Sequence, residues 1–133
     1  MDGQNRSGTA DDPGVQDLER LVHSYYATID DGDYEGLSEL LDPEFVHDRP
    51  DRTLTGRDRF LAFMREKRPR TDTEHVIDAV YANGDDRAVR GSLLDADGNV
   101  LFAFVDVFSL GSDRIDSLRT YTRQPDARRT DDR

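Results

Sequence analysis

A carboxylate side chain occurs in the middle of an apolar strand pattern. Residues 100–110 have the sequence VLFAFVDVFSL, and strand alternation places Asp106 on one face with Phe102, Phe104 and Phe108. The opposite face is apolar as well, so Asp106 is hydrogen-bonded inside the protein, protonated, or exposed to a cavity. A carboxyl group in the last two states can exchange a proton with a bound molecule. Asp106 is therefore a candidate for acid–base chemistry.

Asp48 is a second candidate, at the end of the predicted strand 44–48. Strand alternation places its side chain with Val46 and opposite His47. Asp is also a common turn residue, so an ordinary turn after the strand is the alternative explanation.

Tyr25, His75 and Arg90 are further residues that can carry chemistry. Tyr25 lies on the apolar stripe of a predicted helix, so its hydroxyl points inward, either to a ligand or to a partner in the core. His75 shares a strand face with apolar residues and is either half-buried with one partner or presented to a pocket. Arg90 can bind an anionic substrate, pair with an Asp, or lie on the solvent face.

No cofactor or metal site is predicted. The chain has no Cys, which excludes thiolate ligands, disulfides and cysteine nucleophiles. A metal site would need His47, Asp48 and His75 to converge, and strand alternation sends the first two to opposite faces. The segment 95–99 lacks the later ligands of a calcium loop and is predicted to be a hairpin turn.

The helices that position these residues are predicted from apolar residues spaced three or four apart. The first runs over 12–30, with Asp12 as its N-cap. The second begins after Asp33 and includes Leu41 in its buried face. The third follows a capping box at 55–58 and ends at Lys67.

The predicted strands are 44–48, 53–55, 75–82, 88–94, 100–110 and 114–122. The pairs Asn83-Gly84, Asp97-Gly98 and Gly111-Ser112 are typical of tight hairpins, so the last four strands are expected to form one antiparallel sheet. The fold class is therefore α+β, with helices packed on one face of a bent sheet.

The charged residues are unusual in kind and number. The formal net charge is −11, with 23 Asp against 6 Glu and 17 Arg against a single Lys. Many short acidic side chains and almost no Lys are typical of a halophilic protein, because concentrated salt screens surface repulsion. A GC-rich genome is the alternative explanation, since it also favours Arg and Asp codons.

Length and charge exclude several classes of protein. A chain of 133 residues has room for one domain. Its acidic surface repels phosphate backbones, so no nucleic-acid partner is expected. No apolar run reaches the ~18 residues of a membrane span, and residues 1–14 are polar, unlike a signal peptide. No membrane partner is expected either, and the predicted location is the cytoplasm.

Four segments resemble the nuclear transport factor 2-like superfamily, which includes ketosteroid isomerases and SnoaL-like polyketide cyclases. They are LVHSYYATIDDGD (21–33), FVHDRPDRTLTGRD (45–58), FVDVFSL (104–110) and RIDSLRTY (114–121). The resemblance extends over residues 14–123, so one domain is expected at 12–123, with disordered tails at 1–11 and 124–133. It implies a cone in which a curved antiparallel sheet wraps a long helix and leaves a pocket at its open end.

The resemblance also implies roles for individual residues. Tyr25 and Asp106 match the two donors that stabilise an oxyanion in ketosteroid isomerases, and Asp48 matches the general base. The expected substrate-binding lining consists of Phe102, Phe104, His75, Arg90, Met64 and Leu118. Two tyrosines that support the oxyanion donor in some of these isomerases correspond to Leu41 and Met64, so that network is absent.

These matches imply a protein that binds a small hydrophobic carbonyl compound and moves a proton next to the carbonyl without a cofactor, as an isomerase or cyclase. The alternative is a noncatalytic ligand-binding or dimerisation module of the same fold. In either case, apolar residues such as Val105 and Val107 on the outer sheet face predict a homodimer.

Overall fold

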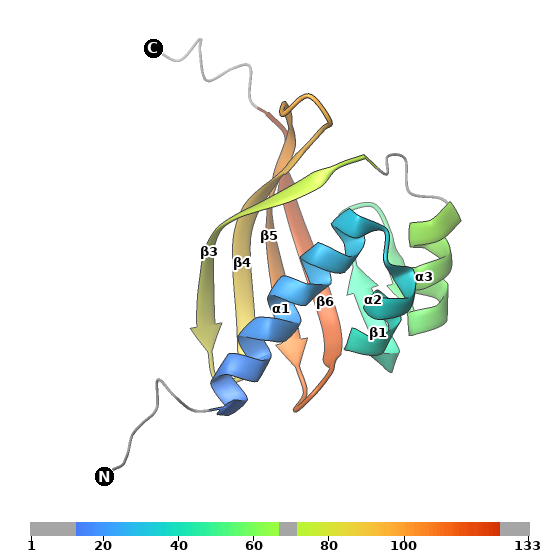
Figure 1. Cartoon of the computed structure of the whole chain (residues 1–133), viewed down its shortest axis with the longest axis vertical. Helices are drawn as coiled ribbons and strands as arrows, with labels where there is room; N and C mark the ends of the chain where they lie inside the picture. Colours follow the sequence, from blue (N-terminus) through green and yellow to red (C-terminus); the bar gives the residue numbers. More distant parts are fainter. Residues whose placement is uncertain (1–12, 67–71, 126–133) are drawn as a thin grey trace.

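A long helix lies against the inner face of a curved sheet, with two shorter helices on the same side (Figure 1). The computed structural model describes residues 13–66 and 72–125. In this part the helices are α1 (Pro13–Asp31), α2 (Tyr34–Leu40) and α3 (Arg57–Glu66). The predicted cap at Asp12, the predicted helix end at Lys67 and most of the predicted tails lie outside the described residues.

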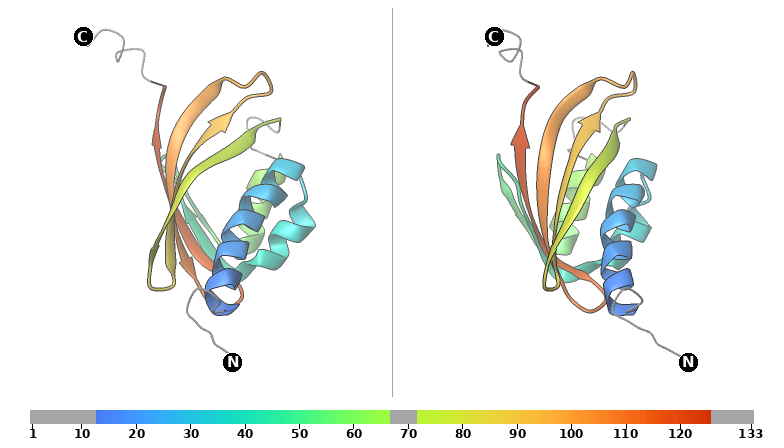
Figure 2. Two further views of the ribbon diagram at one scale, coloured as in Figure 1. Left: turned by 60° about the vertical axis from the view of Figure 1, so that its left-hand side comes forward. Right: turned by 90° about the vertical axis from the view of Figure 1, so that its left-hand side faces the viewer.

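The sheet has six strands in the order β2-β1-β6-β5-β4-β3. The strands are β1 (Leu41–Asp48), β2 (Thr53–Thr55), β3 (Glu74–Asn83), β4 (Asp86–Leu94), β5 (Val100–Leu110) and β6 (Ile115–Arg123). Neighbouring strands are antiparallel except β1 and β6, which are parallel. Two side views show the sheet curving around the helices (Figure 2). The predicted α+β class and the curved sheet packed on helices are confirmed.

One predicted boundary is wrong. Leu41 does not belong to α2 but begins β1 and pairs with Ile115. The strand register is irregular between Leu41 and Val46, and this segment contains Pro43, which cannot donate a hydrogen bond to the sheet. Pro43 therefore lies within a distorted strand.

The turn between α1 and α2 follows from two residues. Gly32 has a φ of +70°, a conformation that glycine adopts without strain, and its N–H donates to Ile29 O at 3.1 Å. The Asp33 carboxylate then accepts from Gly36 N at 2.9 Å and caps α2. The predicted start of the second helix at Asp33 is confirmed, and the turn sends α2 toward α3.

The core lies between α1 and the inner face of the sheet. Its largest fully buried side chains are Phe45, Phe60, Phe108, Leu37, Leu41, Ile115, Leu118, Val22 and Val89. Gly91 on β4 allows close packing there, because a Cβ at this position would come within 2.8 Å of the Phe104 ring. No helix in the described ranges is long and apolar enough to cross a membrane.

Candidate functional site

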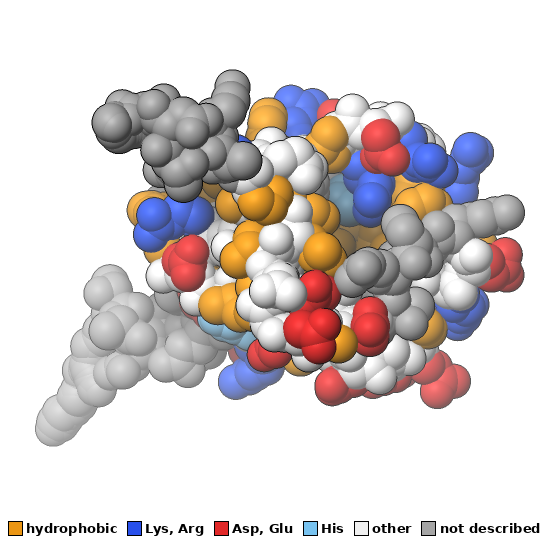
Figure 3. All heavy atoms as spheres, turned by 90° about the horizontal axis from the view of Figure 1, so that it is seen from above, with side chains coloured by type: hydrophobic (Ala, Val, Ile, Leu, Met, Phe, Trp, Pro, Cys, Tyr) orange, Lys and Arg blue, Asp and Glu red, His pale blue; other side chains and the backbone are white. Residues whose placement is uncertain are grey.

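A cavity of about 260 Å³ lies between the concave face of the sheet and the helices. Its apolar lining consists of Ile29, Pro50, Met64, Leu93, Leu101, Phe102 and Phe104, and its polar lining of Tyr25, His47, Arg49, Thr73, His75, Asp106, Thr120 and Thr122. The space-filling view from above shows hydrophobic side chains, a histidine and arginines around a hollow in this end of the molecule (Figure 3). A largely apolar cavity with a few converging polar groups is typical of a small-molecule site.

Asp106 is buried in the cavity wall, with 5% of its surface exposed. Its Oδ2 accepts a hydrogen bond from the Tyr26 hydroxyl at 2.7 Å, and its Oδ1 accepts one from the Thr120 hydroxyl at 2.6 Å. Burial raises the pKa of Asp106, while the hydrogen bonds from Thr120 and Tyr26 partly offset the rise. The side chain is therefore both hydrogen-bonded and cavity-lining, and burial favours its protonated form.

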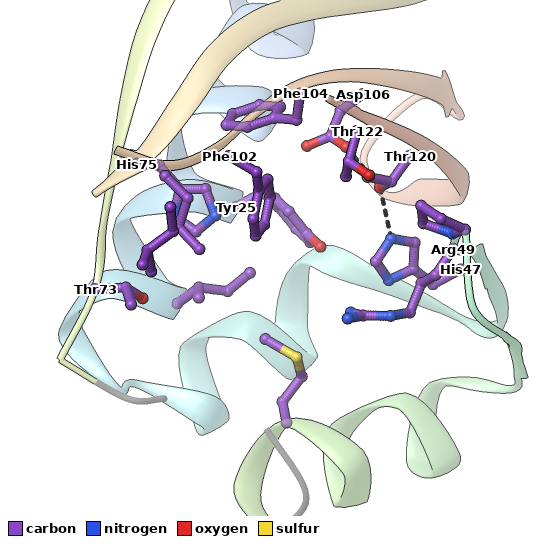
Figure 4. A pocket seen from close by; sticks show the side chains of 15 residues that line it. Tyr25, His47, Arg49, Thr73, His75, Phe102, Phe104, Asp106, Thr120 and Thr122 are labelled. Carbon is purple, nitrogen blue, oxygen red and sulfur yellow. Dashed lines mark hydrogen bonds between the residues drawn. The ribbon is translucent and has the colours of Figure 1, made fainter. Parts of the chain in front are cut away.

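His47 extends this hydrogen-bond chain. Its Nε2 lies 2.8 Å from the Thr120 hydroxyl oxygen, a contact drawn as a dashed line in Figure 4. Burial lowers the pKa of His47 to about 3, with a further contribution from Arg49, so the ring is neutral near pH 7. When Asp106 is ionised, Thr120 gives its hydroxyl proton to Asp106, so Nε2 carries the ring proton and Nδ1 carries the lone pair. Nδ1 is buried and has no hydrogen-bond partner in the described part of the chain.

His75 is held by a carboxylate from the first helix. Its Nδ1 lies 2.6 Å from Asp30 Oδ1, and its backbone N–H donates to Asp30 Oδ2 at 3.0 Å. The ring packs between Tyr26 and Phe104, with centroid distances of 5.0 and 5.7 Å. A neutral imidazole that donates from Nδ1 keeps the lone pair of Nε2 for a ligand, which is the arrangement of a base and its orienting group.

Tyr25 contributes a hydroxyl from the floor of the cavity. The side chain is 3% exposed, and its hydroxyl points into the cavity (Figure 4). The ring is fixed by edge-to-face contact with Phe108 at 5.3 Å and by stacking on Phe60 at 6.4 Å. A phenol held in this way can donate a hydrogen bond to a ligand oxygen.

Asp48, by contrast, does not line the cavity that Tyr25 and Asp106 line, but lies in a groove beside it. Its carboxylate is partly exposed, pairs with Arg119 at 3.1 Å and accepts from the Thr53 hydroxyl at 3.0 Å. The physical reason is strand alternation in β1, which turns Asp48 outward and its neighbour His47 inward.

Two predicted lining residues are also misplaced. Arg90 is exposed on the outer side of the sheet, between Val105 and Ala79. Leu118 is 2% exposed and belongs to the packed core instead of the cavity wall. The other predicted lining residues, Phe102, Phe104, His75 and Met64, do line the cavity.

Sequence reasoning missed Tyr26, Asp30, Arg49 and Thr120. His47 was weighed only as a metal ligand, although its position two residues after buried Phe45 in an apolar strand indicates an inward side chain. The hydrogen bonds that define the other roles join residues far apart in the chain, such as Asp30 with His75 and Tyr26 with Asp106.

Solved structures share this architecture. An NTF2-like protein of unknown function from Burkholderia xenovorans is 14% identical, with a TM-score of 0.71, over 90% of this chain and 95% of its own. A protein from Sinorhizobium meliloti assigned as a polyketide cyclase is 20% identical, with a TM-score of 0.69, over 80% and 97%. One from Kribbella flavida assigned as a ketosteroid isomerase is 20% identical, with a TM-score of 0.67, over 86% and 87%. At these identities the similarity shows the fold alone.

A comparison of the amino-acid sequence with models of protein families identifies the family of this chain. No curated protein matches the chain significantly. The model of the SnoaL-like domain matches residues 22–117, which include the second half of α1, both histidines of the cavity and all of β5. The chain therefore belongs to the SnoaL-like domain family and has the nuclear transport factor 2-like fold.

Proposed function

We propose that this protein binds a small, largely apolar carbonyl compound and transfers a proton at the carbon next to the carbonyl, without a cofactor. The observation that carries the proposal is the arrangement of four groups around one apolar cavity: a carboxylate-held imidazole, a second imidazole, a phenol and a buried carboxyl group. The names of the cyclase and isomerase neighbours are consistent with it.

The base in this proposal is His75. Its Nε2 lone pair takes the proton from the carbon, and Asp30 stabilises the imidazolium that forms. We assign this role to His75 and not to Asp48, which the family resemblance implied, because the Asp48 carboxylate is paired with Arg119 outside the cavity.

The developing negative charge on the ligand oxygen needs hydrogen-bond donors in an apolar setting. Tyr25 supplies a phenol proton, and Asp106 supplies a carboxylic acid proton in the form that burial favours. Phe102 and Phe104 exclude water from this part of the cavity. Return of the proton from His75 to another carbon gives an isomerase, whereas attack of the enolate on a second carbonyl of the same ligand gives a cyclase.

The test is the exchange of α-protons with solvent. The probe is 2-indanone, a small apolar ketone with acidic α-protons, and deuterium uptake from D₂O is followed by proton NMR. The wild-type protein is expected to accelerate the exchange, and His75→Gln is expected to lower the rate by about 10²-fold or more, because a general base contributes about 10²–10⁴-fold.

Asp48→Asn is the matched control. Like His75→Gln it replaces a candidate base with a neutral amide, but Asp48 lies outside the cavity and is paired with Arg119. It should exchange at the wild-type rate. A rate that falls in Asp48→Asn and not in His75→Gln would return the base role to Asp48. Binding of the ketone without any exchange would favour the noncatalytic ligand-binding module.

A further inference from the structure

A cationic side chain stands at the edge of the cavity. Arg49 follows β1 directly and lines both the cavity and a shallower groove beside it. Its side chain is 26% exposed, and its guanidinium lies 4.8 Å from the centre of the Phe63 ring. Figure 4 shows the Arg49 side chain reaching into the cavity beside the His47 ring. The group is thus partly desolvated, held against an aromatic face, and still accessible to a ligand.

Among the described residues, Arg49 shares its ion-pair partner with a second arginine. Arg49 Nε lies 3.4 Å from Asp51 Oδ1, and Arg52 Nε lies 3.3 Å from Asp51 Oδ2. Both guanidinium groups lie over the same Phe63 ring. Two cations therefore share one exposed carboxylate in the described part of the chain, and Asp106 is a further acidic group close enough to feel the charge of Arg49.

The acidic groups nearby are already engaged. Asp106, the one carboxyl group in the cavity lining of the described residues, accepts from Tyr26 and Thr120. Asp30 holds His75, and Asp48 pairs with Arg119. An anion placed against Arg49 therefore meets no unpaired carboxylate in the cavity wall.

The geometry points to a ligand that carries a carboxylate, which binds Arg49 at the cavity edge while the apolar, carbonyl-bearing part fills the cavity. The Arg49 guanidinium has only a shared ion-pair partner and remains accessible, and its planar group fits a carboxylate. The position of the carbonyl group rests on the proposed function, but the anion site does not.

The experiment compares two probes that differ by one charge and one methyl group. They are 4-oxo-4-phenylbutanoate, a ketone with a carboxylate, and its methyl ester, and their affinities are measured by calorimetric titration. The wild-type protein is expected to bind the acid about tenfold or more tightly than the ester, as one charge-assisted contact allows. Arg49→Gln should abolish this preference and leave the affinity for the ester unchanged.

Two further variants sharpen the test. Asp51→Asn removes the shared carboxylate and should increase the preference for the acid, which is a gain that misfolding cannot produce. Arg20→Gln removes an exposed arginine of α1 that is paired with Asp17 and lines neither the cavity nor the groove, and it should keep the wild-type preference.

Equal affinity of the wild-type protein for acid and ester, failure of both probes to bind, or an undiminished preference in Arg49→Gln would overturn the inference. The proposed function fails separately, because these titrations need no turnover. A clear preference for the acid with no exchange of α-protons would contradict proton transfer and leave the carboxylate site standing.

Discussion

Thr120 connects the two buried titratable side chains of the cavity. In the arrangement described above, its hydroxyl donates to Asp106 and accepts from His47. If Asp106 is protonated on Oδ1 while no ligand oxygen accepts that proton, the proton points to Thr120, whose own proton must then turn to His47 Nε2. The ring proton of His47 consequently moves to Nδ1. Protonation of Asp106 and the tautomer of His47 are therefore coupled through one hydroxyl group.

We predict that Thr120→Val uncouples them. The hydrogen bond from Thr120 lowers the pKa of Asp106 against the larger effect of burial, so its removal should raise this pKa further. Carbon NMR of the Asp106 carboxyl group should show titration at a higher pH than in the wild-type protein. Nitrogen NMR should show that the His47 tautomer no longer changes in step with Asp106.

Two variants control for loss of packing at this position. Thr120→Ser keeps the hydroxyl and should restore the coupling. Thr122→Val makes the same change two residues along β6, in the same cavity lining, and should leave the pKa of Asp106 unchanged. A carboxyl group that titrates identically in Thr120→Val and in the wild-type protein would contradict the coupling.

The sequence predicts single residues of the cavity better than their partners. Asp106 can be recognised because a carboxylate between phenylalanines on an apolar strand needs a special environment. Its partner Tyr26 cannot be recognised from the sequence, because Tyr25 and Tyr26 are adjacent in α1 and both are buried. Which of them reaches Asp106 depends on how α1 is rotated against a strand about eighty residues away.

At the scale of elements, the pairing of strands joined by tight turns could be predicted from the sequence. The parallel pairing of β1 with β6 could not. Asn83-Gly84 and Asp97-Gly98 carry positive-φ glycines, and the antiparallel pairing of β3 to β6 follows from these turns. The parallel pairing of β1 with β6 joins strands separated by most of the chain and leaves no local signal. That pairing decides which side of β1 faces the cavity, and so explains the misplacement of Asp48.

The outer face of the sheet carries a strip of mostly apolar residues. Ala79, Arg90, Val105 and Tyr121 lie opposite one another across β3 to β6. Val105 is 37% exposed and Tyr121 is 53% exposed. Exposed apolar side chains in one strip favour association, so the homodimer remains our prediction, with this face as its contact.

The variant that tests this contact is Val105→Glu, which places a charge in the middle of the strip. Light scattering should show a dimer for the wild-type protein and a monomer for the variant. Val100→Glu puts the same charge on another exposed valine, at the hairpin end of β5 and outside the strip, and should stay dimeric. A wild-type monomer would refute the prediction.

At the scale of the whole molecule, the surplus of acidic side chains governs stability. A formal net charge of −11 on 133 residues destabilises the compact state through self-repulsion. Exposed acidic side chains such as Asp31 and Asp85 are accessible to the salt ions that screen them. The Debye length falls from about 10 Å at 0.1 M salt to about 3 Å at 1 M, so added salt should weaken the repulsion.

We therefore expect the melting temperature to rise by roughly 5 °C or more between 0.1 and 1 M NaCl, since about 1 kcal/mol of stabilisation gives a shift of this size in a small domain. Thermal unfolding followed by circular dichroism measures it. The same titration near the isoelectric point is the control, because with little net charge the repulsion is small and the rise should shrink. A melting temperature that does not change with NaCl at neutral pH would favour codon bias as the source of the Asp and Arg content. An equal rise at both pH values would instead indicate that salt acts by strengthening hydrophobic burial.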